Sequence, residues 1–207
     1  VLFRSRPAVY FWCRTMKCAN PGCGRGIPLV TSRWLANSTR RKAWIEFHTE
    51  STAIAITVHT AGAPTGDPTK GTIKASSATC PACGTSMTAN DVRAYGKKTG
   101  FGAHLYAVCD INGRVRQYRV PTNDEIQGAF VEAERRLDYL SDLDDGTSAV
   151  PDEDMVKSQY RRFGNLPFGI DTFAGLFNAR QRYVLGRLAQ GVREMHSQML
   201  ADGLDVG

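Results

Sequence analysis

Short runs of β-branched and aromatic residues dominate the first 121 positions of the chain. Two of the runs, 43–49 and 53–59, alternate apolar with polar residues, as strands do when one face of their sheet is solvated. Polar turn residues at 37–42 and a loop rich in Gly, Pro and Thr at 60–71 separate the runs. The pattern predicts strands at 8–16, 27–35, 43–49, 53–59 and 72–79.

A β-hairpin is predicted over residues 103–121. Asn112-Gly113 lies between its two runs, and this dipeptide best satisfies a type I′ turn, which needs positive φ at both central residues. A short helix at about 89–95 and a glycine-rich, basic connector at 96–102 precede the hairpin. Residues before 122 are therefore expected to form an antiparallel β unit with one short helix.

The spacing of apolar residues changes to the helical period after the hairpin. Thr122, with Glu125 three residues later, is a capping-box pattern and predicts a helix that runs to about Leu140. Asn178 can cap a second helix over about 179–201. The apolar side of this second helix contains Val184, Leu188, Val192, Met195 and Met199.

These elements predict the fold class α+β with two domains. Residues 6–121 are expected to form a β-rich, basic domain, and residues 122–207 a helical, acidic region. An acidic, turn-rich linker near 141–158 and an irregular, aromatic-rich segment at 160–177 interrupt the helical region. Leu2–Ser5 resemble translated adaptor sequence, the chain has no initiator Met, and it stops shortly after a long helical pattern. We therefore expect an internal fragment of a longer protein.

Charge is divided unevenly between the two parts of the chain. The formal net charge of the whole is +6. Residues 1–121 contain 17 Lys/Arg and 5 Asp/Glu, a net charge of +12, whereas residues 122–207 contain 9 and 15, a net charge of −6. A basic half of this kind is expected to meet a polyanion, nucleic acid foremost. A solvated basic surface with no partner is the alternative.

The chain has no apolar run of about 18 residues, so neither a membrane span nor a membrane partner is expected. The N-terminal residues lack the apolar core and cleavage site of a signal peptide. We therefore expect a cytoplasmic location, where cysteines remain reduced.

Four of the six cysteines form two short pairs, Cys18-x4-Cys23 and Cys80-x2-Cys83, each followed at once by glycine. Each pair offers two thiolates to one metal ion, and two pairs complete a tetrahedral sulfur shell. We predict one structural zinc ion held by Cys18, Cys23, Cys80 and Cys83. Four thiolates leave no open position for water, which a catalytic zinc ion needs. Iron in the same shell, disulfides and four unpaired thiols are the alternatives.

The remaining cysteines, Cys13 and Cys109, lie in predicted strands without a paired neighbour and are expected to be buried thiols. The histidines are scattered without metal-ligand spacing, and strand or surface positions explain them. They are His48, His59, His104 and His196.

Three groups of basic residues are candidates for contact with nucleic acid. The first surrounds the turn after the first cysteine pair, with Trp34 and Trp44 nearby, and arginine beside aromatic rings suits phosphate contact and base stacking. Packing of both tryptophans inside the β unit is the favoured alternative for these rings. The second group is in the connector, and the third is Arg114, Arg116 and Arg119 in the hairpin. The main candidates are Arg33, Arg40, Arg41, Lys42, Lys97 and Lys98.

The order of these motifs resembles a known family. VYFWCRTMKCANPGCGRGIPLV, then TCPACG, then the hairpin ending YRVP, then GLFNARQRYVLGRLAQGVREMHSQML are together similar to the zinc-ribbon region of adenine-specific DNA methylases. These are large bacterial and archaeal proteins with an associated N-terminal domain of unknown function. The resemblance extends from about residue 9 over nearly the whole chain, and Cys18–Val30 and Leu176–Gln181 carry most of its specificity.

The resemblance implies a parent protein that transfers a methyl group from S-adenosylmethionine to the exocyclic amine of adenine. That chemistry uses an Asp/Asn-Pro-Pro-Tyr/Phe motif and a glycine-rich cofactor loop. The sequence has no Pro-Pro pair, and Asp171–Gly175 departs from the glycine motif. We therefore expect no catalytic or cofactor-binding residue here.

Two functions follow as expectations. The first is a non-catalytic zinc-ribbon segment that contacts DNA or braces target recognition, and that docks on the catalytic methyltransferase core of the same polypeptide. The alternative is a zinc-ribbon module for protein interaction without nucleic acid.

Overall fold

The computed structural model describes residues 6–138, 140, 148, 150, 153–155 and 164–203. The fold is mixed α and β, in agreement with the α+β class, and it divides into two compact units. Val1–Thr122 with Pro167–Gly169 form the first unit, and Asn123–Leu166 with Ile170–Gly207 the second. Most of the linker expected near 141–158, and the start of the segment expected at 160–177, lie outside the described residues.

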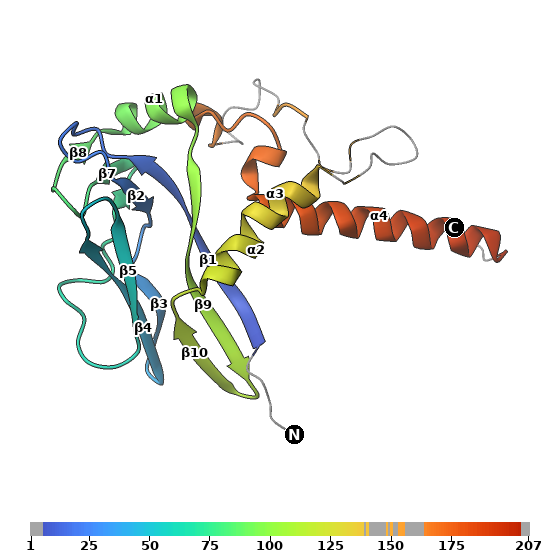
Figure 1. The fold of residues 1–207 in the computed structure, drawn as a ribbon, viewed down its shortest axis with the longest axis horizontal. Helices are drawn as coiled ribbons and strands as arrows, with labels where there is room; N and C mark the ends of the chain where they lie inside the picture. The colour runs from blue at the N-terminus through green and yellow to red at the C-terminus, as the bar shows by residue number, and fades with distance from the viewer. Residues whose placement is uncertain are drawn as a thin grey trace. The chain divides into compact units, whose positions relative to one another are not determined.

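The largest sheet of the first unit has the strand order β10-β9-β1-β2 and is antiparallel throughout (Figure 1). β1 (Arg6–Lys17) and β9 (Gly102–Asn112) form its long centre, with β10 (Val115–Arg119) and β2 (Gly26–Leu29) at the edges. The strand predicted at 8–16 is therefore present, longer at both ends, in the middle of the sheet.

A second, three-stranded sheet is formed by β3 (Trp34–Ser38), β4 (Arg41–Thr49) and β5 (Ile54–His59). The single strand predicted at 27–35 is wrong, because it is divided between β2 and β3, which belong to different sheets. Val30 lies where the chain changes sheets. Its backbone bonds to Thr72, with N–H to Oγ1 at 3.0 Å and its carbonyl to the Thr72 N–H at 2.8 Å, so a distant segment replaces the strand partner it would otherwise have.

A small third sheet contains β6 (Ile73–Lys74), β7 (Ser77–Thr79) and β8 (Ser86–Met87). The one strand predicted at 72–79 is wrong, since these residues form a tight hairpin. Lys74 pairs with Ser77, and the two residues between them, Ala75 and Ser76, have φ values of +48° and +68°. Positive φ at both central positions is the pattern of a type I′ turn. Neither residue type is typical of that turn, which is why the sequence contained no signal for it.

The hairpin predicted at 103–121 is confirmed, but its turn differs from the expected one. Asn112 pairs with Val115, so Gly113 and Arg114 are the central residues, and of these only Gly113 has a positive φ, at +58°. This is the φ pattern of a type II′ turn, with glycine in first place. Asn112 continues the ladder as the last residue of β9, which moves the turn one position along the chain.

Helix α1 (Ala89–Thr99) is longer than the predicted 89–95 and includes most of the expected connector. Thr88 and Asp91 form its capping box, with the Thr88 hydroxyl accepting from the Asp91 N–H and the Asp91 carboxylate accepting from the Thr88 N–H. The helix ends at Gly100, whose φ is +76°.

The second unit contains α2 (Asn123–Ala129), α3 (Val131–Leu137) and α4 (Ala179–Ala201), with a short 3₁₀ turn, η3, at Ala174–Leu176. Another 3₁₀ turn, η2 (Leu166–Phe168), contains the point at which the chain passes from the second unit to the first. The single helix predicted from Thr122 to about Leu140 is wrong, because it is interrupted at Phe130, where ψ is −68° and φ is −111°.

The N-terminus of α4 is capped as predicted, by reciprocal bonds between Asn178 and Gln181 at 2.9 and 3.0 Å. The apolar side of the helix, however, does not face α3. The buried residues of α4 are Ala179, Gly186 and Gln190. At about 100° per residue they lie about 180° around the helix from the apolar stripe. Within that stripe Val184, Leu188, Val192 and Met195 are 54%, 63%, 59% and 67% exposed.

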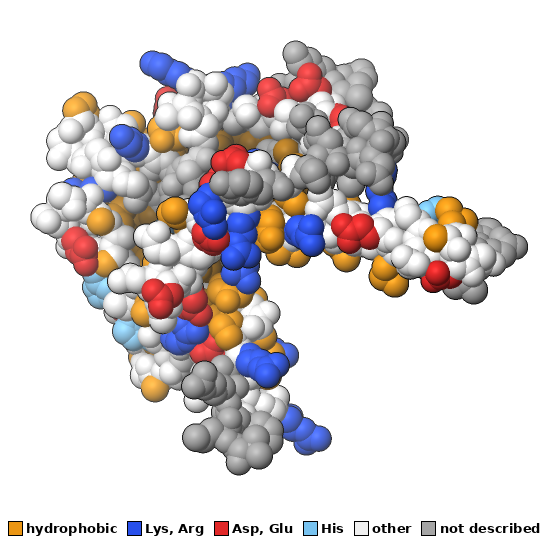
Figure 2. Space-filling model, turned by 45° about the vertical axis from the view of Figure 1, so that its right-hand side comes forward, with side chains coloured by type: hydrophobic (Ala, Val, Ile, Leu, Met, Phe, Trp, Pro, Cys, Tyr) orange, Lys and Arg blue, Asp and Glu red, His pale blue; other side chains and the backbone are white. Residues whose placement is uncertain are grey.

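Contacts from α3 reach the other side of α4. Glu134 accepts a hydrogen bond from Arg182 at 3.1 Å, and the Arg136 guanidinium lies 5.8 Å from the centre of the Tyr183 ring. Figure 2 shows hydrophobic side chains at the surface along the helix, between charged ones. No helix among the described residues is long and apolar enough to cross a membrane.

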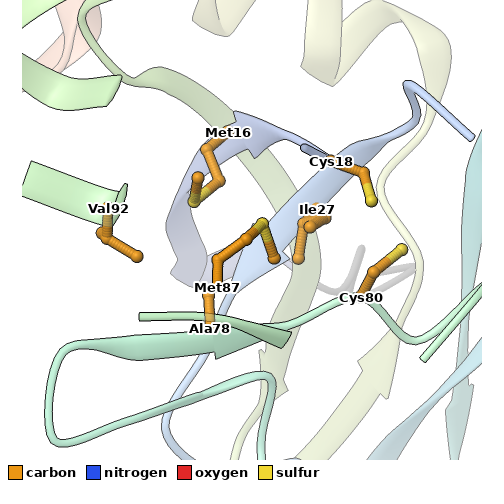
Figure 3. Close-up of a cluster of buried hydrophobic side chains, with 7 residues drawn as sticks. All are labelled: Met16, Cys18, Ile27, Ala78, Cys80, Met87 and Val92. Atoms are coloured by element: carbon orange, nitrogen blue, oxygen red, sulfur yellow. The ribbon is translucent and has the colours of Figure 1, made fainter. Parts of the chain in front are cut away.

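Two hydrophobic clusters lie in the described part of the first unit. One surrounds the cysteine pairs and consists of Met16, Cys18, Ile27, Ala78, Cys80, Met87 and Val92 (Figure 3). The other consists of Cys13, Val30 and Ile45, with Leu35, Phe47, Ile56, Val58 and Tyr106 packed against it. Cys13 and Cys109 are both buried free thiols, as predicted, and burial raises the pKa of Cys13 to about 12.

Ser76→Gly is expected to stabilise the first unit by about 1 kcal/mol. A left-handed backbone costs a residue with a Cβ roughly 1–2 kcal/mol, and glycine avoids most of this cost. Urea denaturation of the metal-loaded protein, followed by tryptophan fluorescence, measures the change. Ser77→Gly, one residue later in β7, is the matched control and should destabilise by about 0.5–1 kcal/mol. A Ser76→Gly midpoint at or below that of the unaltered protein would contradict the turn assignment.

Candidate metal centre

Two β-hairpins present the four paired cysteines at their tips. The loop between β1 and β2 carries the first pair, and the loop between β7 and β8 carries the second. In each hairpin, strand pairing continues to the residues next to the loop, because Lys17 pairs with Gly26 and Thr79 with Ser86. The backbone on both sides of each pair is therefore fixed by strand pairing.

The two loops share the same backbone hydrogen bond. In each, the N–H of the first cysteine donates to the carbonyl of the residue two places after the second cysteine, Cys18 to Arg25 and Cys80 to Thr85, both at 2.9 Å. Asn20 also links the loops, because its side-chain amide donates to the Thr85 hydroxyl at 3.5 Å. Both loops are therefore closed by the same kind of backbone hydrogen bond.

The glycine after each pair closes its loop. Gly24 has a φ of +58° and donates its N–H to Asn20, and Gly84 has a φ of +74° and donates to Cys80. Both conformations lie in the left-handed region, where a Cβ is disfavoured. The left-handed backbone at these two positions explains why a glycine follows each cysteine pair.

The four sulfurs converge on one point. The Sγ atoms of Cys18 and Cys83 are 3.6 Å apart, those of Cys23 and Cys80 are 3.8 Å apart, and all four lie within 4.8 Å of one another. Figure 3 shows the side chains of Cys18 and Cys80 directed toward each other. A tetrahedron with metal–sulfur bonds of about 2.3 Å has sulfur–sulfur edges of about 3.8 Å. The four cysteines can therefore hold a metal ion.

The four sulfurs do not form disulfides with one another. A disulfide needs an S–S distance of about 2.05 Å, far below the separations found here, and all six cysteines are free.

The protonation preferences of the four thiols differ with their position. Burial raises the pKa of Cys18 to about 12 and also raises the pKa of Cys80. The Thr85 hydroxyl, 3.2 Å from Cys83 Sγ, lowers the pKa of Cys83 to about 6, helped by the Thr85 N–H. The backbone N–H and then the guanidinium of Arg25 lower the pKa of Cys23. A bound cation favours the thiolate of every ligand, and the buried pair depends on it most.

Arg25 joins this centre to the second sheet. Its Nη1 lies 3.5 Å from Cys23 Sγ, while Nε and Nη2 donate to the carbonyls of Glu50 and Ser51 at 2.9 and 3.0 Å. Four thiolates around a divalent cation have a net charge of −2, so a guanidinium beside one sulfur offsets part of it. The same side chain fixes the β4–β5 turn.

The basic residues predicted to meet nucleic acid differ in their surroundings. Arg33 is half-buried and supports the 60–71 loop, donating to the carbonyls of Thr65 and Lys70 at 2.9 and 3.3 Å. Arg41 is also half-buried, at the start of β4. Four others are exposed. Arg40 lies in the β3–β4 turn, Lys42 near the start of β4, and Lys97 and Lys98 at the end of α1.

Three other residues considered for contact with nucleic acid have partners inside the first unit. Trp34 and Trp44 meet edge to face with centroids 6.0 Å apart, and Trp44 is only 2% exposed, so packing explains it. Arg119 donates to both carboxylate oxygens of buried Asp110, at 2.6 and 3.1 Å. Arg114 and Arg116 are exposed.

Sequence reasoning missed a second group of ligand-bearing side chains, Glu46, His48 and His59, whose ligating atoms all lie within 4.8 Å of one another. The only signal in the sequence is a period-two pattern, Glu-x-His on one strand and Thr57-x-His on the next. That pattern has meaning only once the register of β4 and β5 is known.

Comparison of the chain with protein-family models, with curated proteins and with solved structures gives no match in any of the three. The fold and the site themselves define the class, which is an α+β protein with a four-cysteine centre able to hold a metal ion.

Cys80→Ser is expected to weaken metal binding at this centre by at least about tenfold, because it removes a direct ligand. A Co²⁺ titration followed by thiolate-to-cobalt charge-transfer absorption measures it. The unaltered protein should saturate this absorption at one equivalent. Cys109→Ser removes a buried thiol outside the centre and is the control, with unchanged absorption. Saturation below one equivalent after reconstitution would contradict the site.

Gly24→Ala and Gly84→Ala are each expected to cost about 1 kcal/mol of stability in the metal-loaded protein. An added Cβ would have nothing within 4 Å at either position, so the cost is conformational. Gly26→Ala is the matched control, since its added Cβ would also have nothing within 4 Å and its φ is not in the left-handed region. Thermal unfolding compares the three. An equal loss for Gly26→Ala would contradict a conformational cause.

Proposed function

We propose that the chain is a non-catalytic zinc-ribbon segment of an adenine-specific DNA methyltransferase that uses S-adenosylmethionine. In this role the basic β unit contacts DNA, and the zinc ion supports the fold. The catalytic core and the S-adenosylmethionine site belong to the parent protein.

The observation that carries the proposal is the closed sulfur shell at the tips of two hairpins. The zinc-ribbon proposal is supported by two facing cysteine loops, each followed by a glycine with a left-handed backbone. Zinc suits four thiolates and has no redox chemistry. Four sulfurs fill its coordination shell, so the centre supports a structural role and not a reaction.

Contact with DNA is supported by charge. The first 121 residues have a net charge of +12, and lysine and arginine on a compact unit neutralise phosphates and release counterions. Exposed side chains are found in and just after the β3–β4 turn, at Arg40 and Lys42, and at the end of α1, at Lys97 and Lys98. The methylase assignment itself is supported by the motif order around Cys18–Val30 and Leu176–Gln181.

The alternative is a zinc-ribbon module for protein interaction without nucleic acid. It is favoured by one observation, the exposed apolar stripe of α4, which runs from Val184 through Leu188 and Val192 to Met195. A stripe of this kind on an amphipathic helix suits a hydrophobic groove on a partner. In the methyltransferase proposal, the same stripe would dock on the catalytic core.

Duplex DNA is expected to bind the zinc-loaded protein in a salt-dependent manner. The logarithm of the binding constant should fall linearly with the logarithm of salt concentration, by about 0.9 for each phosphate neutralised. Fluorescence anisotropy of labelled DNA at several salt concentrations measures the slope. The paired variants Arg40→Ala/Lys42→Ala and Lys97→Ala/Lys98→Ala should weaken binding and reduce the slope by about 1 for each phosphate that is no longer neutralised.

Arg187→Gln/Arg193→Gln is the matched control, because it removes the same charge from α4 in the acidic unit. An equal loss of affinity in all three variants would contradict contact through the named residues. Absence of binding even at low salt would remove the DNA role and leave the protein-interaction alternative, which predicts a stable partner through α4. A flanking reading frame without an Asp/Asn-Pro-Pro-Tyr/Phe motif would contradict the methyltransferase assignment.

A further inference from the structure

A second cluster of ligand-bearing side chains lies on the β3-β4-β5 sheet. Ile45 and Phe47 of β4 point into the hydrophobic cluster around Cys13. Because successive side chains of a strand alternate, Glu46 and His48 lie on the opposite face. In the register of β4 with β5, Trp44 is opposite His59 and Glu46 is opposite Thr57. Pairing thus places one carboxylate and two imidazoles on a single face.

The two imidazoles converge on one hydroxyl. His48 Nε2 lies 2.8 Å from Thr57 Oγ1, and His59 Nε2 lies 3.0 Å from the same atom. Glu46 Oε2 is 3.6 Å from His59 Nε2. The hydroxyl has one proton, so it can donate to only one of the two rings. Two Nε2 atoms and a carboxylate oxygen therefore surround the same small volume.

The carboxylate is held in place before any ligand arrives. Glu46 Oε1 accepts from the Thr65 N–H at 2.8 Å and from the Trp44 indole N–H at 3.2 Å. The Thr65 N–H is also the main cause that lowers the pKa of Glu46. Oε1 is occupied by these donors, while Oε2 faces His59.

The ring of His59 is also fixed. It stacks on the Trp44 indole with centroids 5.6 Å apart and an interplanar angle of 15°. Trp44 is almost fully buried and contacts Trp34 edge to face, so the surface under the imidazole is rigid. Support of this kind from outside the ligand shell is typical of metal-binding histidines.

We propose that Glu46, His48 and His59 form a second metal site, for a divalent transition-metal ion and zinc foremost. Two imidazoles and one carboxylate are a donor set typical of open zinc sites, in which water takes the remaining position. Ligand atoms around a tetrahedral zinc ion lie about 3.3 Å apart, so a bound ion draws the three inward and displaces the Thr57 hydroxyl from between the rings. The site is independent of the DNA-binding proposal.

The surroundings set the affinity and leave the ion accessible. Glu46 and His48 line an open cleft of about 510 Å³, together with Arg33 and Lys70. The positive charges of Arg33 and Lys70 disfavour a metal cation beside them. The site is therefore expected to bind a metal ion more weakly than the four-cysteine centre, and to be occupied only after that centre.

The test uses the full chain without a histidine tag, first loaded with one equivalent of Zn²⁺ at the four-cysteine centre. Isothermal titration with further Zn²⁺ should then find a second equivalent. His48→Ala and Glu46→Gln should each weaken this second step by at least about tenfold, and should leave the first equivalent intact. His48 is exposed, so its removal does not disturb the core.

His196→Ala, an exposed histidine on α4, is the matched control and should leave the second step unchanged. Thr57→Val removes the competing hydroxyl and should leave the affinity equal or higher. Ring resonances of His48 and His59 should shift during the second step, and those of His104 and His196 should not. Saturation at one equivalent, or equal losses for His196→Ala and His48→Ala, would overturn the proposal.

Discussion

The convergence of four sulfurs from two hairpins is the constraint on which the first unit depends. The sulfurs that meet come from residues 57 and 65 positions apart in the chain. Closing a loop of that length costs entropy that grows only with the logarithm of its length. Metal binding to small thiolate sites supplies roughly 10–16 kcal/mol, which exceeds this cost. Two of the cysteines, Cys18 and Cys80, are themselves part of the hydrophobic cluster in Figure 3, so the centre and the packing around it share residues.

The second sheet belongs to the segment enclosed by this closure. β3, β4 and β5 all lie between the two cysteine pairs in the sequence, and Arg25 bonds the first pair to the turn between β4 and β5. The Glu46 and His59 cluster therefore sits on a sheet whose turn is tied to the sulfur centre. The two groups of side chains differ in chemistry, because one offers four sulfur atoms and the other nitrogen and oxygen atoms.

The sequence by itself determined the features that depend on neighbours in the chain. Ligand spacing and trailing glycines identified Cys18, Cys23, Cys80 and Cys83, and the capping residue Asn178 identified the start of α4. The hairpin of β9 and β10 was also predictable, because its strands pair locally. These features follow from local backbone chemistry, in which residues a few positions apart decide the outcome.

Tertiary structure alone decided the rest, because each remaining feature depends on distant partners. Thr72 divides the strand predicted at 27–35 by bonding to Val30 from 42 positions away. Packing against α3 selects the face of α4 that is buried, against its apolar pattern. The register of β4 with β5 brings Glu46 and His59 onto one face, and no local pattern specifies that register. Long-range pairing and packing, with their own free energies, override local preference at each of these places.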